Sequence, residues 1–164
     1  MFKRTLPPNM TFERRNRRPP RDPVNALLSL GYTLLTQNMI TACEVVGLDP
    51  YDGFLHGDKY GRPALALDLV EPFRAVVVDL VVKALVSRRM VRPRNFTPHG
   101  EGVYLSQRAM QRFLRAYTAR LETTVTDRRS GVRLSYQKDF ELETRKLARA
   151  IQETLDSYQP SRTR

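Results

Sequence analysis

The chain has 164 residues, of which 41% are hydrophobic and 9% aromatic, so it can bury one core of ordinary size. It carries 28 Lys and Arg against 17 Asp and Glu, and the net charge of +11 is typical of proteins that bind a polyanion. One cysteine excludes an internal disulfide framework, and the absence of a long apolar run excludes a membrane span, so we expect a soluble intracellular protein with no membrane partner.

Residues 1–21 form a basic arm, in which four prolines oppose a stable helix. The arm is interpreted either as a solvated, partly disordered terminus or as a flexible strand that binds nucleic-acid phosphates. A helical domain is expected over residues 22–160, followed by a short tail over 161–164. In the second interpretation, the arm's candidate DNA-binding residues are Arg14, Arg15, Arg17 and Arg18.

The first long helix is predicted to begin at Asp22, because Asp is a preferred N-cap and Pro23 fits the first turn. Apolar residues continue at helical spacing up to Gly47, which is a typical helix terminator. Gly31 costs this helix about 1 kcal/mol relative to alanine, which indicates close packing of another backbone segment. The apolar face is expected to comprise Val24, Leu27, Leu28, Leu34, Leu35, Ile40 and Val45.

A second helical pattern runs from about Ala64 to Met90, after a loop over residues 48–63. Its β-branched run VVVDLVV resembles a strand, but the helical period continues well past strand length on both sides. Pro72 lies inside the pattern and should kink it or mark a local break. The expected apolar face comprises Leu65, Leu69, Phe73, Val76, Val77, Leu80, Val81, Ala84 and Leu85.

Two further helices are predicted after a linker over residues 91–102 and a short, extended segment over 103–105. The third is capped by Ser106, continues to about Val125, and places Met110, Phe113, Leu114, Tyr117 and Leu121 inward. The fourth spans about Ser135 to Tyr158 and places Phe140, Leu147, Ala150, Ile151 and Leu155 inward. The sequence therefore predicts an all-α fold, a bundle of about four long helices with a basic N-terminal arm.

Two carboxylates and one imidazole are candidates for a metal site. Asp68 and Glu71 lie three residues apart on the second helix, so both project from one face. His56 ends a short apolar step in the preceding loop, which can fold back toward them. One His with carboxylates suits Mn²⁺ or Mg²⁺ better than zinc, since no second His or Cys lies near. The alternative is a pair of solvated residues at the edge of the core.

Several arginines are candidates for DNA contacts. Arg88, Arg89, Arg92 and Arg94 form a cationic run without an acidic residue, and a row on the third helix comprises Arg108, Arg112 and Arg115. Each alone is interpreted as part of a solvated face, whereas together they fit a phosphate-binding track. Cys43 is interpreted as a small buried hydrophobe and His99 as a surface residue.

Three segments in order carry a family resemblance: RNRRPPRDPVNALLSLGYTLL, GLDPYDGFLH and GRPALALDLVEPFR. Together they resemble the C-terminal helical domain of the CRISPR adaptation integrase, the metal-dependent DNA endonuclease that inserts new spacers into CRISPR arrays. The resemblance covers residues 12–160 and includes a final Tyr158-Gln159-Pro160.

The resemblance implies functional roles for individual residues. His56 and Glu71 match metal ligands of the family, and Asp68 matches an acidic residue that supports the site. These three are the candidate catalytic residues, with Mn²⁺ or Mg²⁺ as cofactor. Arg62 and Arg74 flank the carboxylates and are candidates for binding phosphate oxygens, with an ion pair as the alternative. The implied partners are protospacer and CRISPR-repeat DNA and the small ferredoxin-like adaptation protein, in a prokaryotic cytoplasm.

The chain also departs from the family pattern. The third ligand of the family is a Glu on a helix before the NRRPP segment, and Glu13 does not match its position. The family's N-terminal β domain has no counterpart here either. We therefore expect a C-terminal fragment, truncated, split or fused in nature, that binds the metal weakly and is inactive alone. The alternative is a non-catalytic module that binds DNA or assembles an adaptation complex, with a separate N-terminal half as a further partner.

Overall fold

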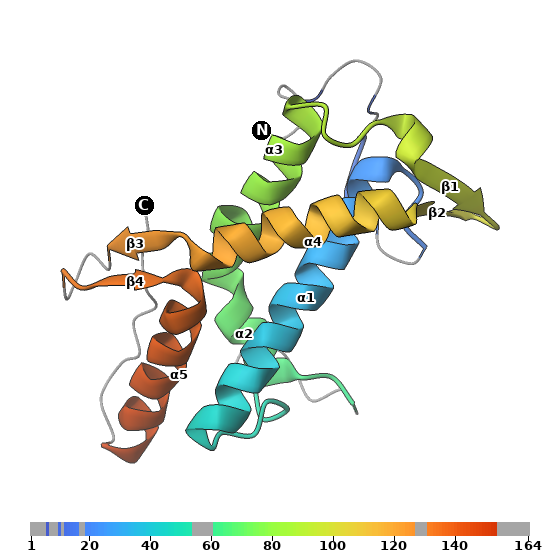
Figure 1. Ribbon diagram of the computed structural model, residues 1–164. Coiled ribbons are helices and arrows are strands. Elements are labelled where there is room, and N and C mark those ends of the chain that lie inside the picture. Colours follow the sequence, from blue (N-terminus) through green and yellow to red (C-terminus); the bar gives the residue numbers. More distant parts are fainter. Residues whose placement is uncertain are drawn as a thin grey trace. The chain divides into compact units, whose positions relative to one another are not determined.

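Helices carry most of the regular backbone in the computed structural model of the chain (Figure 1). The structure describes residues 6, 10, 12–16, 19–53, 61–126 and 131–153. Its α-helices are α1 (Pro23–Val46), α2 (Ala64–Phe73), α3 (Leu80–Ser87), α4 (Gln107–Glu122) and α5 (Tyr136–Gln152). A π-helical segment, Arg74–Asp79, joins α2 to α3, and a 3₁₀ turn, Pro93–Asn95, follows α3. The predicted all-α class is confirmed.

Two short antiparallel hairpins complete the described part of the chain. Strands β1 (Phe96–His99) and β2 (Gly102–Leu105) pair with each other, as do β3 (Thr124–Thr126) and β4 (Arg133–Ser135). The extended segment predicted at residues 103–105 is confirmed as part of β2. The expectation of a plain linker over residues 91–102 is wrong, because its second half forms β1 and the turn to β2.

The chain divides into two compact units. Unit 1 combines residues 1–33 with 77–120, and unit 2 combines residues 34–76 with 121–164. Fully buried side chains of unit 1 include Leu27, Val78 and Phe113. Those of unit 2 include Met39 and, from α2 and α5, the rings of Phe73 and Phe140, which meet edge to face with centroids 4.7 Å apart.

The ends of α1 follow the prediction. Asp22 caps the helix, because its Oδ1 accepts a 2.8 Å hydrogen bond from the backbone N–H of Asn25. At the other end, Gly47 adopts a φ of +88°, in the left-handed region that glycine tolerates. The N–H of Leu48 then reaches back to the carbonyl of Cys43 over 2.9 Å, which closes the last turn.

Pro72 interrupts the second helical pattern, as predicted. It has no N–H to donate to the carbonyl one turn earlier, and its ring crowds that carbonyl. The backbone is π-helical over the six residues Arg74–Asp79 and returns to the α form at Leu80. The local break therefore takes the form of a π-helical segment that begins two residues after Pro72.

The structure corrects several details of the predicted helices. The third helix ends at Glu122 and not near Val125, because residues 124–126 pair as β3. The fourth is described only to Gln152, and Leu155 and residues 158–160 lie outside the described residues. Four residues expected on buried faces are exposed, either because they point away from their helix's buried side or because they lie in its last turn: Val45, Leu80, Leu114 and Ile151.

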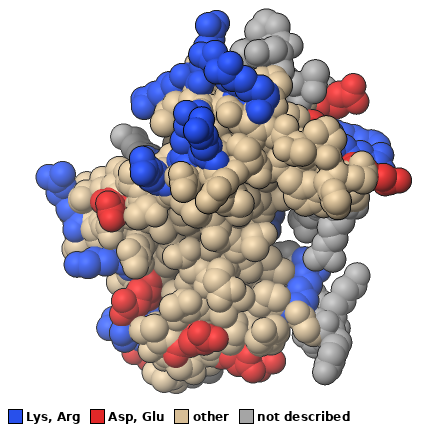
Figure 2. Space-filling model, turned by 45° about the vertical axis from the view of Figure 1, so that its right-hand side comes forward, with Lys and Arg blue, Asp and Glu red and all other residues tan. Residues whose placement is uncertain are grey.

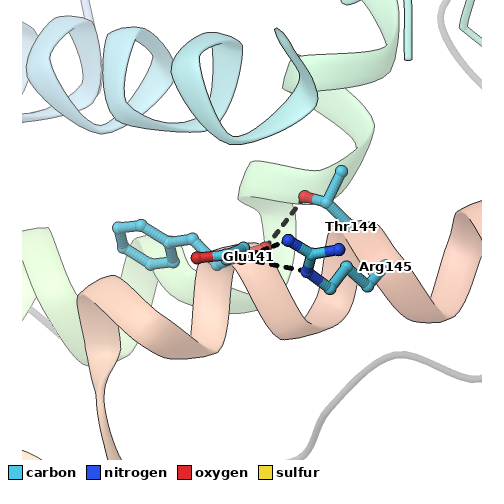
Figure 3. Close-up of polar contacts among 4 residues, drawn as sticks. Glu141, Thr144 and Arg145 are labelled. Atoms are coloured by element: carbon cyan, nitrogen blue, oxygen red, sulfur yellow. Dashed lines mark hydrogen bonds and ion pairs between the residues drawn. The ribbon is translucent and has the colours of Figure 1, made fainter. Parts of the chain in front are cut away.

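The α5 backbone shows how unit 2 accommodates a buried hydroxyl (Figure 3). Thr144 is fully buried, and its Oγ1 donates a 2.8 Å hydrogen bond to the carbonyl of Phe140 one turn earlier. On the exposed side, the guanidinium of Arg145 donates to Oε1 of Glu141 over 2.7 and 2.9 Å.

None of the helices in the described ranges has the combination of length and apolarity that crossing a bilayer requires.

Gly31 marks the tightest approach in unit 1. A Cβ placed on Gly31 would overlap Cγ1 of Val78 and lie 3.1 Å from Cζ of Phe113. The predicted close packing is therefore confirmed, although side chains and not a backbone segment fill the space.

We expect Gly31→Ala to destabilise the protein by about 1–2 kcal/mol. Overpacking a core costs roughly 1–3 kcal/mol, which outweighs the gain of about 1 kcal/mol in helix propensity. Urea unfolding measures the difference. The same change made in a Val78→Ala background should be neutral or stabilising, since the methyl groups it would strike are gone. A stabilising Gly31→Ala in the original background would contradict this account of the packing.

Candidate functional site

The candidate carboxylates lie on α2, which packs through the buried residues Leu65, Leu69 and Phe73. This packing leaves Asp68 half-buried at the border of the apolar face and Glu71 exposed beyond it. Oε1 of Glu71 lies 3.0 Å from a terminal nitrogen of Arg74, one helical turn further along. The two predicted carboxylates and one of the two predicted flanking arginines thus share one surface of unit 2.

Arg74 is placed by the backbone irregularity that Pro72 introduces. It is the first residue of the π-helical segment, and its side chain is only 25% exposed. Its backbone N–H still donates to the carbonyl of Val70, so the turn carrying Glu71 stays closed. π-Helical turns occur frequently at functional sites. The geometry holds a guanidinium beside a carboxylate, an arrangement that suits phosphate binding next to a cation.

The described residues provide part of a metal donor set. Carboxylate oxygens are the ligands that Mg²⁺ and Mn²⁺ prefer, so Asp68 and Glu71 fit such an ion chemically. Within the described ranges, His, Cys, Asp and Glu form no group of three or more that could hold a metal. His56 lies outside the described residues. A cation at Glu71 would also compete with the ion pair to Arg74.

The arginines predicted at 88–94 lie together in unit 1, on the segment between α3 and β1. Arg88, Arg89, Arg92 and Arg94 are all exposed. Figure 2 shows Lys and Arg side chains gathered at the top of one face, where Figure 1 has the end of α3. We call these four residues the basic segment.

Hydrogen bonds hold the basic segment in an ordered form. The backbone N–H of Arg92 donates to Oδ1 of Asn95 over 2.9 Å, and Arg112 of α4 donates to the carbonyl of Met90 over 2.7 Å. Arg89 itself has a φ of +54°, which turns the chain sharply after α3. The four guanidinium groups are therefore carried on a folded loop, which reduces the entropy lost on binding a ligand.

The arm contributes a second, different cluster. Arg15 donates to Oδ1 of Asn25 over 2.8 Å and to Oγ of Ser29 over 3.0 Å, and its guanidinium lies 5.4 Å from the ring centroid of Tyr32. These contacts support a structural role for Arg15, and DNA binding by this residue stays a prediction. Arg14 is exposed, whereas Arg17 and Arg18 lie outside the described residues.

Asn25 is the residue of this cluster that sequence reasoning missed. It is fully buried. Its side-chain amide accepts hydrogen bonds from the guanidinium of Arg15 and the backbone N–H of Asn16, and it donates to the carbonyl of Arg14 and the carboxylate of Asp22. Its only signal in the sequence is a polar residue next to the apolar positions of α1. Residues 14–16 of the arm are therefore hydrogen-bonded to α1, contrary to the interpretation of a solvated terminus for this part of the arm.

Cys43 and His99 behave as predicted, whereas phosphate binding by Arg62 stays a prediction. Cys43 is buried, and burial followed by the charges of Glu44 and Asp49 raises the pKa of its thiol to about 11. The thiol is thus protonated near neutral pH and is a poor nucleophile. His99 is exposed, as expected for a surface residue. Arg62, just before α2, is half-buried.

Residues 1–119 match the family described as CRISPR associated protein Cas1. The chain belongs to the Cas1 family. It is 43% identical over 159 residues to the CRISPR-associated endonuclease Cas1 3 of Thermus thermophilus, a match that covers 97% of this chain and 48% of the relative. The chain thus spans about half the length of this curated Cas1 relative. The family resemblance predicted from the sequence is confirmed.

Solved structures agree with this assignment. A casposase bound to an integration product superposes on the Cas1 chain with a TM-score of 0.88 at 27% identity, covering 96% of this chain and 45% of the casposase. A partial Cas6-RT-Cas1–Cas2 complex gives a TM-score of 0.84 at 25% identity, covering 98% of this chain and 48% of the matched one.

Replacement of Arg14 and of Arg15 should separate fold from surface charge. We expect Arg15→Ala to destabilise the Cas1 chain by about 1–3 kcal/mol, because it removes the hydrogen bonds that the guanidinium donates to Ser29 and to the buried Oδ1 of Asn25, which keeps only the one from the N–H of Asn16. Arg14→Ala removes the same charge from an exposed side chain and should change stability by less than about 0.5 kcal/mol. Denaturant unfolding of both variants provides the comparison. Equal effects would show that Arg15 has no special role in docking the arm.

Proposed function

We propose that the chain is the helical, DNA-binding part of a CRISPR adaptation integrase and endonuclease that acts in a prokaryotic cytoplasm. The observation that carries this proposal is the surface of α2, where Asp68 and Glu71 lie beside Arg74 in a chain of the Cas1 family. The substrates in this proposal are protospacer and CRISPR-repeat DNA. The bound state of the similar casposase, which is described with an integration product, supports this class of substrate.

His56 and Glu71 are proposed as the metal ligands in this chain, with Asp68 supporting the site. A divalent ion, Mn²⁺ or Mg²⁺, would activate a 3′-hydroxyl and stabilise charge on the phosphate when bound. Arg74 is proposed to hold a phosphate oxygen once Glu71 turns to the cation, and Arg62 to bind a neighbouring phosphate. Asp68 sits half-buried one turn before Glu71, where its carboxylate would support the ligand set.

The same proposal extends to the basic segment and the arm. The exposed guanidinium groups at residues 88–94, together with Arg14, Arg15, Arg17 and Arg18, would bind the DNA backbone without reading its sequence. The small ferredoxin-like adaptation protein is proposed as a protein partner, which the similar Cas1–Cas2 complex supports. A further segment that supplies a Glu ligand is proposed to complete the metal site, either in the same polypeptide or in a separate one.

A second candidate function is a non-catalytic DNA-binding or assembly module. Two observations favour it: the described carboxylates do not form a complete metal site, and Glu71 already pairs with an arginine. The two candidates share the fold and the charge. They differ in whether divalent metal and a completing segment produce chemistry, which the second of the following experiments measures.

DNA binding should depend strongly on salt and weakly on sequence. If about six phosphates are neutralised, the logarithm of the affinity falls against the logarithm of the salt concentration with a slope near −5. Replacing the four arginines of the basic segment by Glu should weaken binding to all sequences about equally and make the slope shallower. A control with the same loss of charge replaces four exposed basic residues of unit 2, namely Arg133, Lys138, Arg145 and Arg149. Equal losses in the two variants would argue against a defined track.

Strand transfer should require the completing segment. We expect the 164-residue chain alone to show little or no strand transfer on a branched CRISPR-repeat substrate, even with millimolar Mn²⁺, because its described residues supply only part of a donor set. Supplying a Glu-bearing N-terminal segment, in trans or fused ahead of Met1, should restore activity. His56→Ala and Glu71→Ala should then abolish it.

The control for this experiment is Glu141→Ala, which removes an exposed carboxylate that also pairs with an arginine. It should leave the restored activity unchanged. Turnover by the chain alone that is lost on Glu71→Ala would show that another acid completes the site. Absence of activity even with the segment supplied would favour the non-catalytic module.

A further inference from the structure

Two aromatic side chains lie together on the exposed hairpin of unit 1. In its register, Phe96 pairs with Leu105, Thr97 with Tyr104 and His99 with Gly102, so His99 and Tyr104 are diagonal neighbours on the same face. Their rings meet edge to face, with centroids 6.2 Å apart and planes inclined by 71°. Both side chains are exposed, Tyr104 to 48%.

The Tyr104 ring lies against the hairpin in the space that a side chain at residue 102 would occupy. A Cβ on Gly102 would lie 2.9 Å from Cε2 of Tyr104 and 2.9 Å from Cβ of Pro19. The ring edge and the arm therefore share the space above this glycine. The backbone of Gly102 is not strained, since its φ is not positive. The close approach of Tyr104 and Pro19 is therefore enough to explain a glycine at position 102. One edge of the Tyr104 ring lies against the hairpin, and 48% of the residue stays exposed.

The arm also fixes the hairpin backbone. The N–H of Val103 donates to the carbonyl of Pro20 over 2.8 Å, and Arg21 lies 3.7 Å from the carboxylate of Glu101 at the turn. At the base of the hairpin, the N–H of Ser106 donates to the carbonyl of Asn95 over 2.8 Å. The two rings are thus presented on a backbone that is tied at both ends, and little order has to be gained when a ligand binds.

Positive charge closely precedes this aromatic pair in the sequence. The basic segment leads directly into β1, and its last two arginines, Arg92 and Arg94, precede Phe96 by only four and two residues. Exposed rings beside arginines are the combination that binds single-stranded nucleic acid, because bases stack on the rings while guanidinium groups bind phosphates. Inside a duplex the base faces are covered by their neighbours, so an exposed ring favours unpaired bases.

We propose that His99 and Tyr104 form a stacking platform for unpaired bases, with Arg92 and Arg94 binding the adjacent phosphates. The ligand is a single strand, either free or as the overhang of a duplex. This inference rests on the proposed DNA binding and adds a base-binding element to it. Because every base has a π face, the platform selects for unpaired structure and not for sequence.

The chain offers a direct reporter for the platform. It contains no tryptophan, so Tyr104→Trp introduces the only one, at the centre of the proposed site. Titration with an oligothymidylate should quench its fluorescence, because the indole stacks on a base. A blunt duplex of the same charge should quench it weakly or not at all. Tyr51→Trp, at an equally exposed tyrosine of unit 2, provides the control and should respond to neither.

Affinity measurements test the contribution of the ring. Tyr104→Ala should weaken binding to a single strand or an overhang by about tenfold, within the range typical of base–aromatic stacking, and leave blunt-duplex binding unchanged. Tyr104→Phe should bind as the original chain does. Tyr104→Leu keeps apolar volume but lacks a π face, and should resemble Tyr104→Ala. The salt dependence of binding should stay the same in all three, because no phosphate contact is lost.

The outcomes separate this proposal from the broader one. If the unmodified chain binds neither single strands nor duplexes, the proposed DNA binding fails. If it binds both and Tyr104→Ala matches it on single strands, only the platform is overturned. The tryptophan emission per molecule could instead be unchanged by DNA and change with protein concentration. That result would identify a contact between protein copies, and would also overturn the platform. Unfolding curves matching the original chain confirm that Tyr104→Ala is folded.

Discussion

The side-chain amide of Asn25 ties residues 14–16 of the arm to the start of α1. Its nitrogen donates to Oδ2 of Asp22 over 2.6 Å and to the carbonyl of Arg14 over 2.9 Å. Its oxygen accepts from the guanidinium of Arg15 and, over 3.0 Å, from the N–H of Asn16. A buried amide is costly unless its hydrogen bonds are made, so these partners are required together. The same amide therefore joins the start of α1 to residues 14–16 of the arm.

Local rules predicted those parts of the fold that depend on neighbours in sequence. The N-cap at Asp22, the terminator at Gly47 and the break after Pro72 follow from backbone chemistry that needs no tertiary context. The hairpin at residues 96–105 was missed because Pro98 and Gly100 are typical of loops, and its pairing depends on the arm. The exposure of Leu80 was missed because a helical period does not show where the register changes to a π form.

The candidate site divides in the same way. Three-residue spacing on a helix is enough to place Asp68 and Glu71 on one face, and the ion pair that was the alternative role of Arg74 is present with Glu71. The structural use of Arg15 was not predicted, since a run of arginines in a proline-rich arm gives no indication that one of them contacts a buried asparagine 10 residues away. His56 falls outside the described residues, so the approach of the loop to α2 stays a prediction.

The buried thiol of Cys43 has a consequence for the chemistry of the surface. Burial raises the pKa of this thiol to about 11, so little thiolate is present at pH 7, and the residue is buried in unit 2. Alkylating reagents and disulfide exchange act on the thiolate, so Cys43 of the folded chain should react with them only slowly. A cysteine introduced at any exposed position, such as Arg94 or Tyr104, would consequently be modified selectively against this unreactive background.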